Sequence, residues 1–326
     1  MIGIVVVVAV AITAIASILI YSTVNTPSIP VKVSIRPGDT TADIALALSS
    51  RAVIKSALLF RLYVKERRAD ERLQSGEYHM RTGMSNEEAL ELLLKGPYVK
   101  YYKITIPEGM TVRETARAVD KASPIKEEQF LASAKKSGYD IPFLKELPDE
   151  SLEGCLFPKT YTITDKTEAK DLVSMMLWQY QKETSGLDMS YVRSRDLGLH
   201  DVITIASIIE KEVRLSSERE LVSQVIYNRL DRQMALQMCS TVQYVLPKWK
   251  EELTYSDLEV DSPYNTYLHT GLPPGPIASP GIASIKAALQ PKPGNYLFFV
   301  LTGDDGSHTF TETSEEFERV KNEYGR

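Results

Sequence analysis

The amino-acid sequence predicts an α+β fold that follows an N-terminal transmembrane helix. Three observations favour it: an uncharged apolar segment at the N-terminus, a repeated unit of strand end, glycine turn and helix, and two closing strands before a charged helix. We expect four parts: a transmembrane anchor over residues 1–22, a linker over 23–30, a β-α module over 31–120 and a mixed α+β domain over 121–326.

The first segment is predicted to span a membrane. No charged residue lies between Ile2 and Tyr21, and about 20 apolar residues can cross a bilayer as a helix. A cleavable secretory signal is the alternative, because Ala14-Ile-Ala16 is similar to a cleavage site. The apolar run is longer than a signal core and no basic residues precede it, so we expect an uncleaved anchor. Pro27 and Pro30 exclude a helix from the linker.

A weak repeat follows the linker. Ile35-Arg-Pro-Gly-Asp-Thr40 and Ile106-Pro-Glu-Gly-Met-Thr111 each precede an apolar-periodic stretch, and Met80-Arg-Thr-Gly-Met-Ser85 is a looser copy. Each copy has a strand end, a glycine turn and a Ser or Thr helix cap. Glycine followed by threonine can also simply cap a helix. Three copies nevertheless resemble the β-α units of a LysM-like module, which we predict over residues 31–120.

The remaining chain predicts helices, one long irregular loop and a hairpin. Helices are expected around 170–183 and 203–213, and Ser217-Glu-Arg-Glu220 has the form of a capping box for another. The loop from Ser262 to Gly281 contains five prolines and three glycines, so it cannot be one regular element. A rigid loop can hold side chains in fixed positions for a ligand, although it can also be a mere connector. The closing strands fit a short hairpin.

Composition excludes several classes of function. The net charge of -5 gives no basic face for nucleic acid. Cys155 and Cys239 have no metal-ligand spacing with the four histidines, so we predict no metal and no cofactor. The two cysteines form either one disulfide or two free thiols. No Gly-x-Ser-x-Gly elbow is present, and a serine or cysteine nucleophile is poorly supported.

Glu210 is the candidate general acid. It lies in the apolar stretch Ile203 to Val213, on a stripe of small residues. Apolar surroundings raise the pKa of a carboxyl group, and a general acid must hold a proton near neutral pH. The alternative is an exposed Glu210 paired with Arg214. Glu212 points about 200 degrees away on a helix, so the two carboxyl groups cannot face one bond.

Nine motifs, found in order along nearly the whole chain, together resemble one family. They are Ile106-Pro-Glu-Gly-Met-Thr111, Leu152-Glu-Gly, Leu156-Phe-Pro-Lys-Thr-Tyr161, Ala206-Ser-Ile-Ile-Glu-Lys-Glu212, Asn228-Arg-Leu230, Tyr264-Asn-Thr-Tyr267, Gly271-Leu-Pro-Pro-Gly275, Ile277-Ala-Ser-Pro-Gly281 and His308-Thr-Phe310. The family is that of the endolytic murein transglycosylases, the MltG or YceG-like family. Its members cleave inside nascent glycan strands and leave 1,6-anhydro-muramic ends.

The resemblance implies roles for individual residues. Glu210 becomes the catalytic acid, which protonates the glycosidic oxygen and then accepts the proton of the attacking 6-hydroxyl group. The residues implied to bind substrate are Gln237, Thr241, Tyr264, Asn265 and Tyr267. Cys239 stands where the family commonly has an Asp, and Glu212 is expected to be structural. The 121–326 region becomes the catalytic domain.

The resemblance also implies partners and a location. We expect peptidoglycan glycan strands as substrate, peptidoglycan synthases such as penicillin-binding proteins as partners, and single-pass attachment to the cytoplasmic membrane with the catalytic domain on its extracytoplasmic side. Two alternatives stay open. One is a glycan-binding scaffold that performs no chemistry, and the other is a hydrolytic muramidase with a second acid on a distant loop.

Overall fold

The computed structural model describes residues 28–148 and 150–324, which form two compact units that divide after Lys100. Most of the predicted anchor and linker lies outside the described residues. Within them, no helix is both long and apolar enough to cross a membrane. The strands form short antiparallel pairs, and helices lie between the strands along the chain, which confirms the predicted α+β class.

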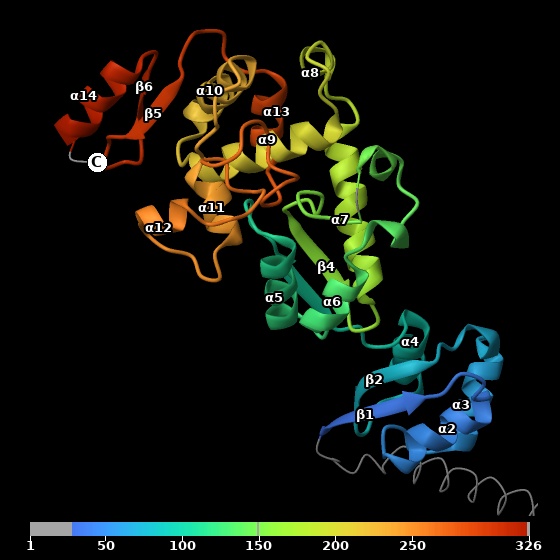
Figure 1. Cartoon of the computed structure of the whole chain (residues 1–326). Coiled ribbons are helices and arrows are strands. Elements are labelled where there is room, and N and C mark those ends of the chain that lie inside the picture. The colour runs from blue at the N-terminus through green and yellow to red at the C-terminus, as the bar shows by residue number, and fades with distance from the viewer. Residues whose placement is uncertain (1–27, 149, 325–326) are drawn as a thin grey trace, which may run out of the picture. The chain divides into compact units, whose positions relative to one another are not determined.

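The first unit pairs two strands and packs three helices beside them (Figure 1). Its elements are β1 (Pro30–Ile35), α2 (Thr41–Ser50), α3 (Ala57–Glu66), a 3-10 turn (Asp70–Arg72), β2 (Gly76–Arg81) and α4 (Asn86–Lys95). The strands are antiparallel, with Val33 opposite Tyr78. Both side chains are buried in the unit's apolar core, because alternate strand residues face the same side.

The repeat motifs form the predicted helix caps. Thr40, Ser85 and Thr111 each accept a hydrogen bond from a backbone N–H in the first helical turn, and each belongs to a capping box. The glycine two residues before each cap has a positive φ, which a side chain would disfavour; these are Gly38, Gly83 and Gly109. The Thr111 copy lies in the second unit, so the structural division comes earlier than the boundary predicted after residue 120.

The second unit contains two further antiparallel strand pairs and a group of helices. Its first half has β3 (Tyr101–Thr105), α5 (Val112–Ala122), α6 (Glu127–Ser133), β4 (Thr160–Thr164), α7 (Ala169–Thr184) and α8 (Ser190–Arg193), with 3-10 turns at Lys136–Gly138 and Pro142–Glu146. Its second half has α9 (Leu199–Glu212), α10 (Arg219–Asp231), α11 (Cys239–Val245), α12 (Tyr255–Leu258), α13 (Ile282–Leu289), β5 (Phe298–Leu301), β6 (His308–Thr311) and α14 (Ser314–Tyr324), with a 3-10 turn at Ser216–Glu218. The predicted helix at 170–183 and the closing hairpin are confirmed.

Helix α9 is the centre of this unit. Every residue from Val202 to Ile209 is buried, as expected for a helix covered on all sides. Helices α10, α11 and α13 pack around it (Figure 1). The helix carries its last residues, Glu210 to Glu212, out of this core toward the neighbouring loops. Its burial therefore fixes the position of both carboxyl groups.

Two sequence interpretations are settled by side-chain contacts. The predicted capping box at 217–220 is wrong, because Glu218 is the N-cap of α10 and makes no side-chain cap bond there. Its carboxylate accepts hydrogen bonds from His308 in β6 instead. Both cysteines are free thiols, with Cys155 buried and Cys239 exposed.

Candidate active site

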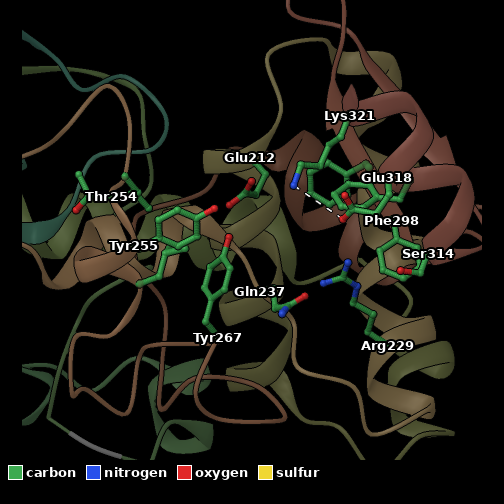
Figure 2. A pocket seen from close by; sticks show the side chains of 14 residues that line it. Glu212, Arg229, Gln237, Thr254, Tyr255, Tyr267, Phe298, Ser314, Glu318 and Lys321 are labelled. Carbon is green, nitrogen blue, oxygen red and sulfur yellow. Dashed lines mark ion pairs between the residues drawn. The ribbon is translucent and has the colours of Figure 1, made fainter. Parts of the chain in front are cut away.

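An open cavity of about 770 Å³ lies in the second half of the second unit (Figure 2). One wall comes from the end of α9, from α10 and from the turns at Gln237 and Tyr267. The facing wall comes from the C-terminal hairpin and α14. The segment before and within α12 completes the rim, from Leu253 to Leu258. The volume falls in the range of small-molecule and oligomer subsites.

Glu212, the last residue of α9, faces this cavity. One of its carboxylate oxygens accepts a hydrogen bond from the backbone N–H of Ser240 at 2.9 Å. That N–H belongs to the first turn of α11, where backbone donors lack partners within the helix. Figure 2 shows the carboxyl group pointing toward the hydroxyl groups of Tyr255 and Tyr267. The carboxyl is thus oriented by the fold and open to a ligand.

Tyr267 and Cys239 keep their protons beside Glu212. Burial, the neighbouring Cys239 and the Glu212 charge raise the pKa of Tyr267. Desolvation of the sulfur atom and the Glu212 charge likewise raise the pKa of the Cys239 thiol, although the residue as a whole is exposed. The phenol oxygen and the thiol sulfur lie 3.1 Å apart. At neutral pH the phenol is a hydrogen-bond donor and the thiol is a poor nucleophile.

Arg229 joins the two walls of the cavity. Its guanidinium donates to the carbonyl oxygens of Leu236 and Leu297, each at 2.6 Å. The first carbonyl precedes Gln237 and the second precedes β5. The guanidinium also lies 5.2 Å from the ring centre of Phe298. Burial lowers the pKa of Arg229, while the nearby Tyr267 and Glu212 oppose that change.

Glu210 lies on the other side of α9 and does not line the cavity. One of its oxygens accepts a hydrogen bond from the N–H of Gly281 at 3.0 Å, and the other lies 3.6 Å from a guanidinium nitrogen of Arg219. Its side chain is 7% exposed. Gly281 is the N-cap of α13, so Glu210 satisfies a free donor at that helix start. The predicted alternative partner, Arg214, is replaced by Arg219.

Glu108 is a second carboxyl group beside the Glu210–Arg219 pair, more exposed to solvent but still partly desolvated, and the sequence did not reveal it. A side chain at Gly281 would overlap the Glu108 carboxylate. Burial and the charge of Glu210 raise the pKa of Glu108, while Arg219 lowers it. Its motif was interpreted as a copy of the β-α repeat and as part of the family resemblance, with no role for Glu108 itself, because the contact joins residues far apart in sequence. Two carboxyl groups and one guanidinium therefore brace the start of α13.

The predicted substrate-binding residues divide into two groups. Gln237 and Tyr267 line the cavity with Glu212. Asn265 and Thr241 are fully buried behind it and are satisfied internally. The Asn265 amide nitrogen donates to two backbone carbonyls and its oxygen accepts from the N–H of Tyr267 at 3.0 Å. Asn265 therefore positions Tyr267, while the Thr241 hydroxyl donates to Met238 within its own turn.

Tyr264 points elsewhere. Its ring lies 5.0 Å from that of Tyr244, and it lines a separate small hollow with Glu153 and His200. Glu153 accepts a hydrogen bond from the backbone N–H of Val112 at the start of α5, at 3.0 Å. Burial raises the pKa of Glu153 to about 7. These residues stabilise the junction of α5 with the loop that bears Tyr264.

Aromatic side chains on the facing wall were not predicted as site residues. Phe298 and Phe317 stack with ring centres 5.3 Å apart, and Phe299 lies beside them in the lining. Tyr255 at the rim is 89% exposed. An aromatic ring this exposed has no packing role, and flat rings are suited to the C–H faces of sugars. No single sequence motif indicates this aromatic surface, because its residues come from separate elements of the chain.

The facing wall is attached through a buried pair. Glu218 accepts hydrogen bonds from the backbone N–H of His308 at 2.8 Å and contacts its Nδ1 atom at 2.7 Å. Each side chain is 9% exposed. The pair links the turn before α10 to strand β6. Among residues 28–148 and 150–324, no cluster of side chains suited to a metal ion occurs.

Comparisons with known proteins cover most of the chain. A family model described as the YceG-like family matches residues 33–323. The endolytic murein transglycosylase of Bacillus subtilis is 34% identical over 310 residues, which are 90% of this chain and 84% of that protein. The endolytic murein transglycosylase of Streptococcus pneumoniae is 31% identical over 317 residues, which are 89% of this chain and 57% of that protein.

A solved structure supports the same grouping. The crystal structure of a YceG-like protein from Listeria monocytogenes matches with a TM-score of 0.60 and 32% sequence identity. The match covers 90% of this chain and 100% of that one. Sequence motifs, family model and fold agree over nearly the same residues. This chain therefore belongs to the YceG-like family.

Proposed function

We propose that the protein is an endolytic lytic transglycosylase that cleaves peptidoglycan glycan strands. The relatives named endolytic murein transglycosylase support the activity. The observation that carries the assignment to a site is the single carboxyl group of Glu212 on an inner wall whose other polar groups are neutral or cationic. The enzyme would cut MurNAc-GlcNAc bonds within nascent strands, leave 1,6-anhydroMurNAc ends and so limit strand length.

Glu210 and Glu212 are the two candidates for proton transfer: the family resemblance implies Glu210, whereas the lining of the cavity supports Glu212, which is the residue that we assign here. The Glu212 carboxyl would protonate the glycosidic oxygen as the C1–O bond breaks. It would then accept the proton of the sugar's own 6-hydroxyl group as that oxygen bonds to C1. No water enters the product, and the carboxyl group regains its starting proton. Glu210 has one oxygen hydrogen-bonded to Gly281 and the other 3.6 Å from Arg219, and it is not among the residues that line the cavity.

Neighbouring residues would hold the sugar and the acid. The phenol of Tyr267 and the amide of Gln237 can donate to substrate hydroxyl groups. Gln237 has a φ of 50°, a backbone conformation that non-glycine residues rarely adopt and that clusters at functional sites. The exposed ring of Tyr255 and the Phe298 wall would pack against the sugar faces. Positioning of this kind contributes a large share of enzymatic rate.

A hydrolytic muramidase is the second candidate, because one more acid lines the cavity. Glu318 on α14 is 57% exposed and lies 3.9 Å from Lys321. In a hydrolase it would activate water while Glu212 acts as acid. Glu318 is exposed to solvent and paired with Lys321 on its own helix, whereas a backbone hydrogen bond holds Glu212 in place, and we therefore favour the transglycosylase.

The test is digestion of uncrosslinked glycan strands by wild-type, Glu212→Gln and Glu210→Gln proteins, with mass analysis of the new ends. We expect ends lighter by one water than hydrolytic ends from the wild type and from Glu210→Gln, and none from Glu212→Gln. Reducing ends that disappear in Glu318→Gln would support the muramidase. Loss of cleavage in Glu210→Gln, with folding intact and Glu212→Gln active, would return the catalytic role to Glu210.

The location and further partners are also proposals. The apolar residues 2–21 would anchor the chain in the cytoplasmic membrane with both units on the extracytoplasmic side. The first unit, whose β1, α2, α3 and β2 have a strand-helix-helix-strand order, would act as a LysM-like glycan grip. Peptidoglycan synthases are the expected neighbours. A glycan-binding scaffold would instead bind strands and release no fragments in the same digestion.

A further inference from the structure

Helix α3 of the first unit exposes three leucines within five residues. Leu58, Leu59 and Leu62 are 63%, 49% and 56% exposed. The opposite side of the helix is buried through Phe60 and Val64. Single exposed apolar residues are ordinary, but a cluster on one helix marks a surface that contacts something apolar.

Basic side chains lie among these leucines. Arg61 and Lys65 are both exposed on the same helix. The segment from residue 51 to 72 contains seven basic and three acidic residues, a net charge of +4, in a chain whose net charge is -5. An apolar stripe bordered by Arg and Lys is the pattern of helices that lie on anionic lipid.

The shape of this surface also favours lipid over sugar. Leu58, Arg61, Leu62 and Lys65 follow helical spacing and line one side of an open hollow of about 520 Å³. The other side is formed by small and polar residues, namely Thr40, Thr41, Ala42 and Asp70. None of the described residues that line it is aromatic, so they offer a sugar no ring to pack against. Acyl chains can cover leucines while phosphates pair with the basic groups.

The position of the unit in the chain brings this surface near a bilayer. Eight residues separate Tyr21, at the end of the apolar segment, from Pro30 at the start of β1. A fully extended chain spans at most about 3.5 Å per residue, so eight residues reach about 28 Å. If residues 2–21 span the membrane, the first unit stays within this distance of it. Tethering at short range makes even a weak surface contact effective.

We propose that the α3 surface, defined as Leu58, Leu59, Arg61, Leu62 and Lys65, docks on a bilayer that contains anionic lipid. The proposal rests on the membrane anchor of the proposed function. The leucines enter the interfacial region and the basic groups pair with lipid phosphates. Docking fixes the orientation of the first unit on the membrane, which attachment through one segment of the chain alone does not do.

The test uses full-length protein in lipid nanodiscs made with or without phosphatidylglycerol. Hydrogen exchange is measured over residues 57–66. Two basic groups near an anionic surface favour docking by about 30-fold in equilibrium constant, so exchange of α3 should slow by about tenfold or more when anionic lipid is present. Leu58→Ser/Leu62→Ser and Arg61→Ser/Lys65→Ser should each remove this protection.

Controls separate docking from folding and from anchoring. Leu268→Ser changes a leucine of the second unit that is 52% exposed, and should leave α3 protection unchanged. Urea unfolding checks that the exposed α3 substitutions preserve stability. If the protein co-elutes with the discs and α3 exchanges equally fast in both lipids, the proposal is wrong. Protection of α3 by soluble glycan fragments, without anionic lipid, would also overturn it. Protein that leaves the discs would refute the anchor, and co-sedimentation with phosphatidylglycerol vesicles would then test the α3 surface. Co-sedimentation that is lost in both double variants would support docking, and no co-sedimentation of the wild type would overturn it.

Discussion

Removing the Glu218 carboxylate should loosen the facing wall of the cavity, formed by the C-terminal hairpin and α14, and leave Glu212 in place. Glu218 accepts from the His308 backbone at 2.8 Å and contacts Nδ1 at 2.7 Å. In Glu218→Ala both His308 groups lose their partner in a site where the side chains are nine-tenths buried. Hydrogen bonds to a charged group contribute about 1.5 to 3 kcal/mol each. The expected loss of stability is therefore about 3 to 5 kcal/mol, the range for broken buried pairs.

The assay for this prediction combines urea unfolding with cleavage kinetics. If glycan binds in this cavity as proposed, loosening of β5, β6 and α14 should raise KM and leave kcat little changed, because the substitution leaves Glu212 in place. Glu220→Ala is the matched control, because Glu220 is an exposed acid in the next turn. A stability loss below about 0.5 kcal/mol, the range of ordinary surface substitutions, with an unchanged KM would refute the role of this pair.

Three more predictions follow from the site. Burial raises the pKa of Glu153 to about 7 from an ordinary value of 4.5, so its contribution to stability is full below pH 4.5 and is lost as the pH rises through 7. The free energy of unfolding of Glu153→Gln, measured in urea, should therefore match that of wild type at pH 4.5 and exceed it by about 3 kcal/mol at pH 8. An equal pH dependence of the two proteins would contradict this reasoning. Tyr255→Ala should raise KM about tenfold, as expected for a lost aromatic contact of about 1.4 kcal/mol, and leave kcat little changed. Tyr255→Phe, which keeps the ring, should stay near wild type. A fall in kcat alone would instead mean that Tyr255 takes part in the chemical step. Iodoacetamide should alkylate Cys239 slowly at pH 7 and faster above pH 9, because desolvation of the sulfur and the Glu212 charge raise the pKa of the thiol. The adduct should block cleavage. A midpoint of the alkylation rate below pH 8 would contradict the raised pKa.

Local features of the fold could be predicted from the sequence, because their causes are local. The caps at Thr40, Ser85 and Thr111 depend on residues within one helical turn, and all three form as expected. The capping box at 217–220 fails for a reason that no local pattern contains. The helix begins one residue later than the box predicts, with Glu218 as its N-cap, and the Glu218 carboxylate bonds His308, a partner far along the chain. Short-range rules hold until a distant group offers a stronger contact.

The site shows the same limit. Helical periodicity correctly separates Glu210 from Glu212 but does not say which side of α9 opens to a cavity. That depends on where α14 and the Tyr267 loop pack, which is a property of long-range contacts. Asn265 was expected in the cleft because a rigid proline-rich loop can hold side chains toward a ligand and because the family resemblance implies that role. Its buried amide instead holds the turn that presents Tyr267.

The cavity is built from parts that the ribosome makes at different times. Glu212 and its backbone donor are synthesised early in the second half of the unit, whereas the Phe317 and Lys321 wall comes with the last described helix. An unfinished chain therefore has the acid without the enclosure that would hold a sugar against it.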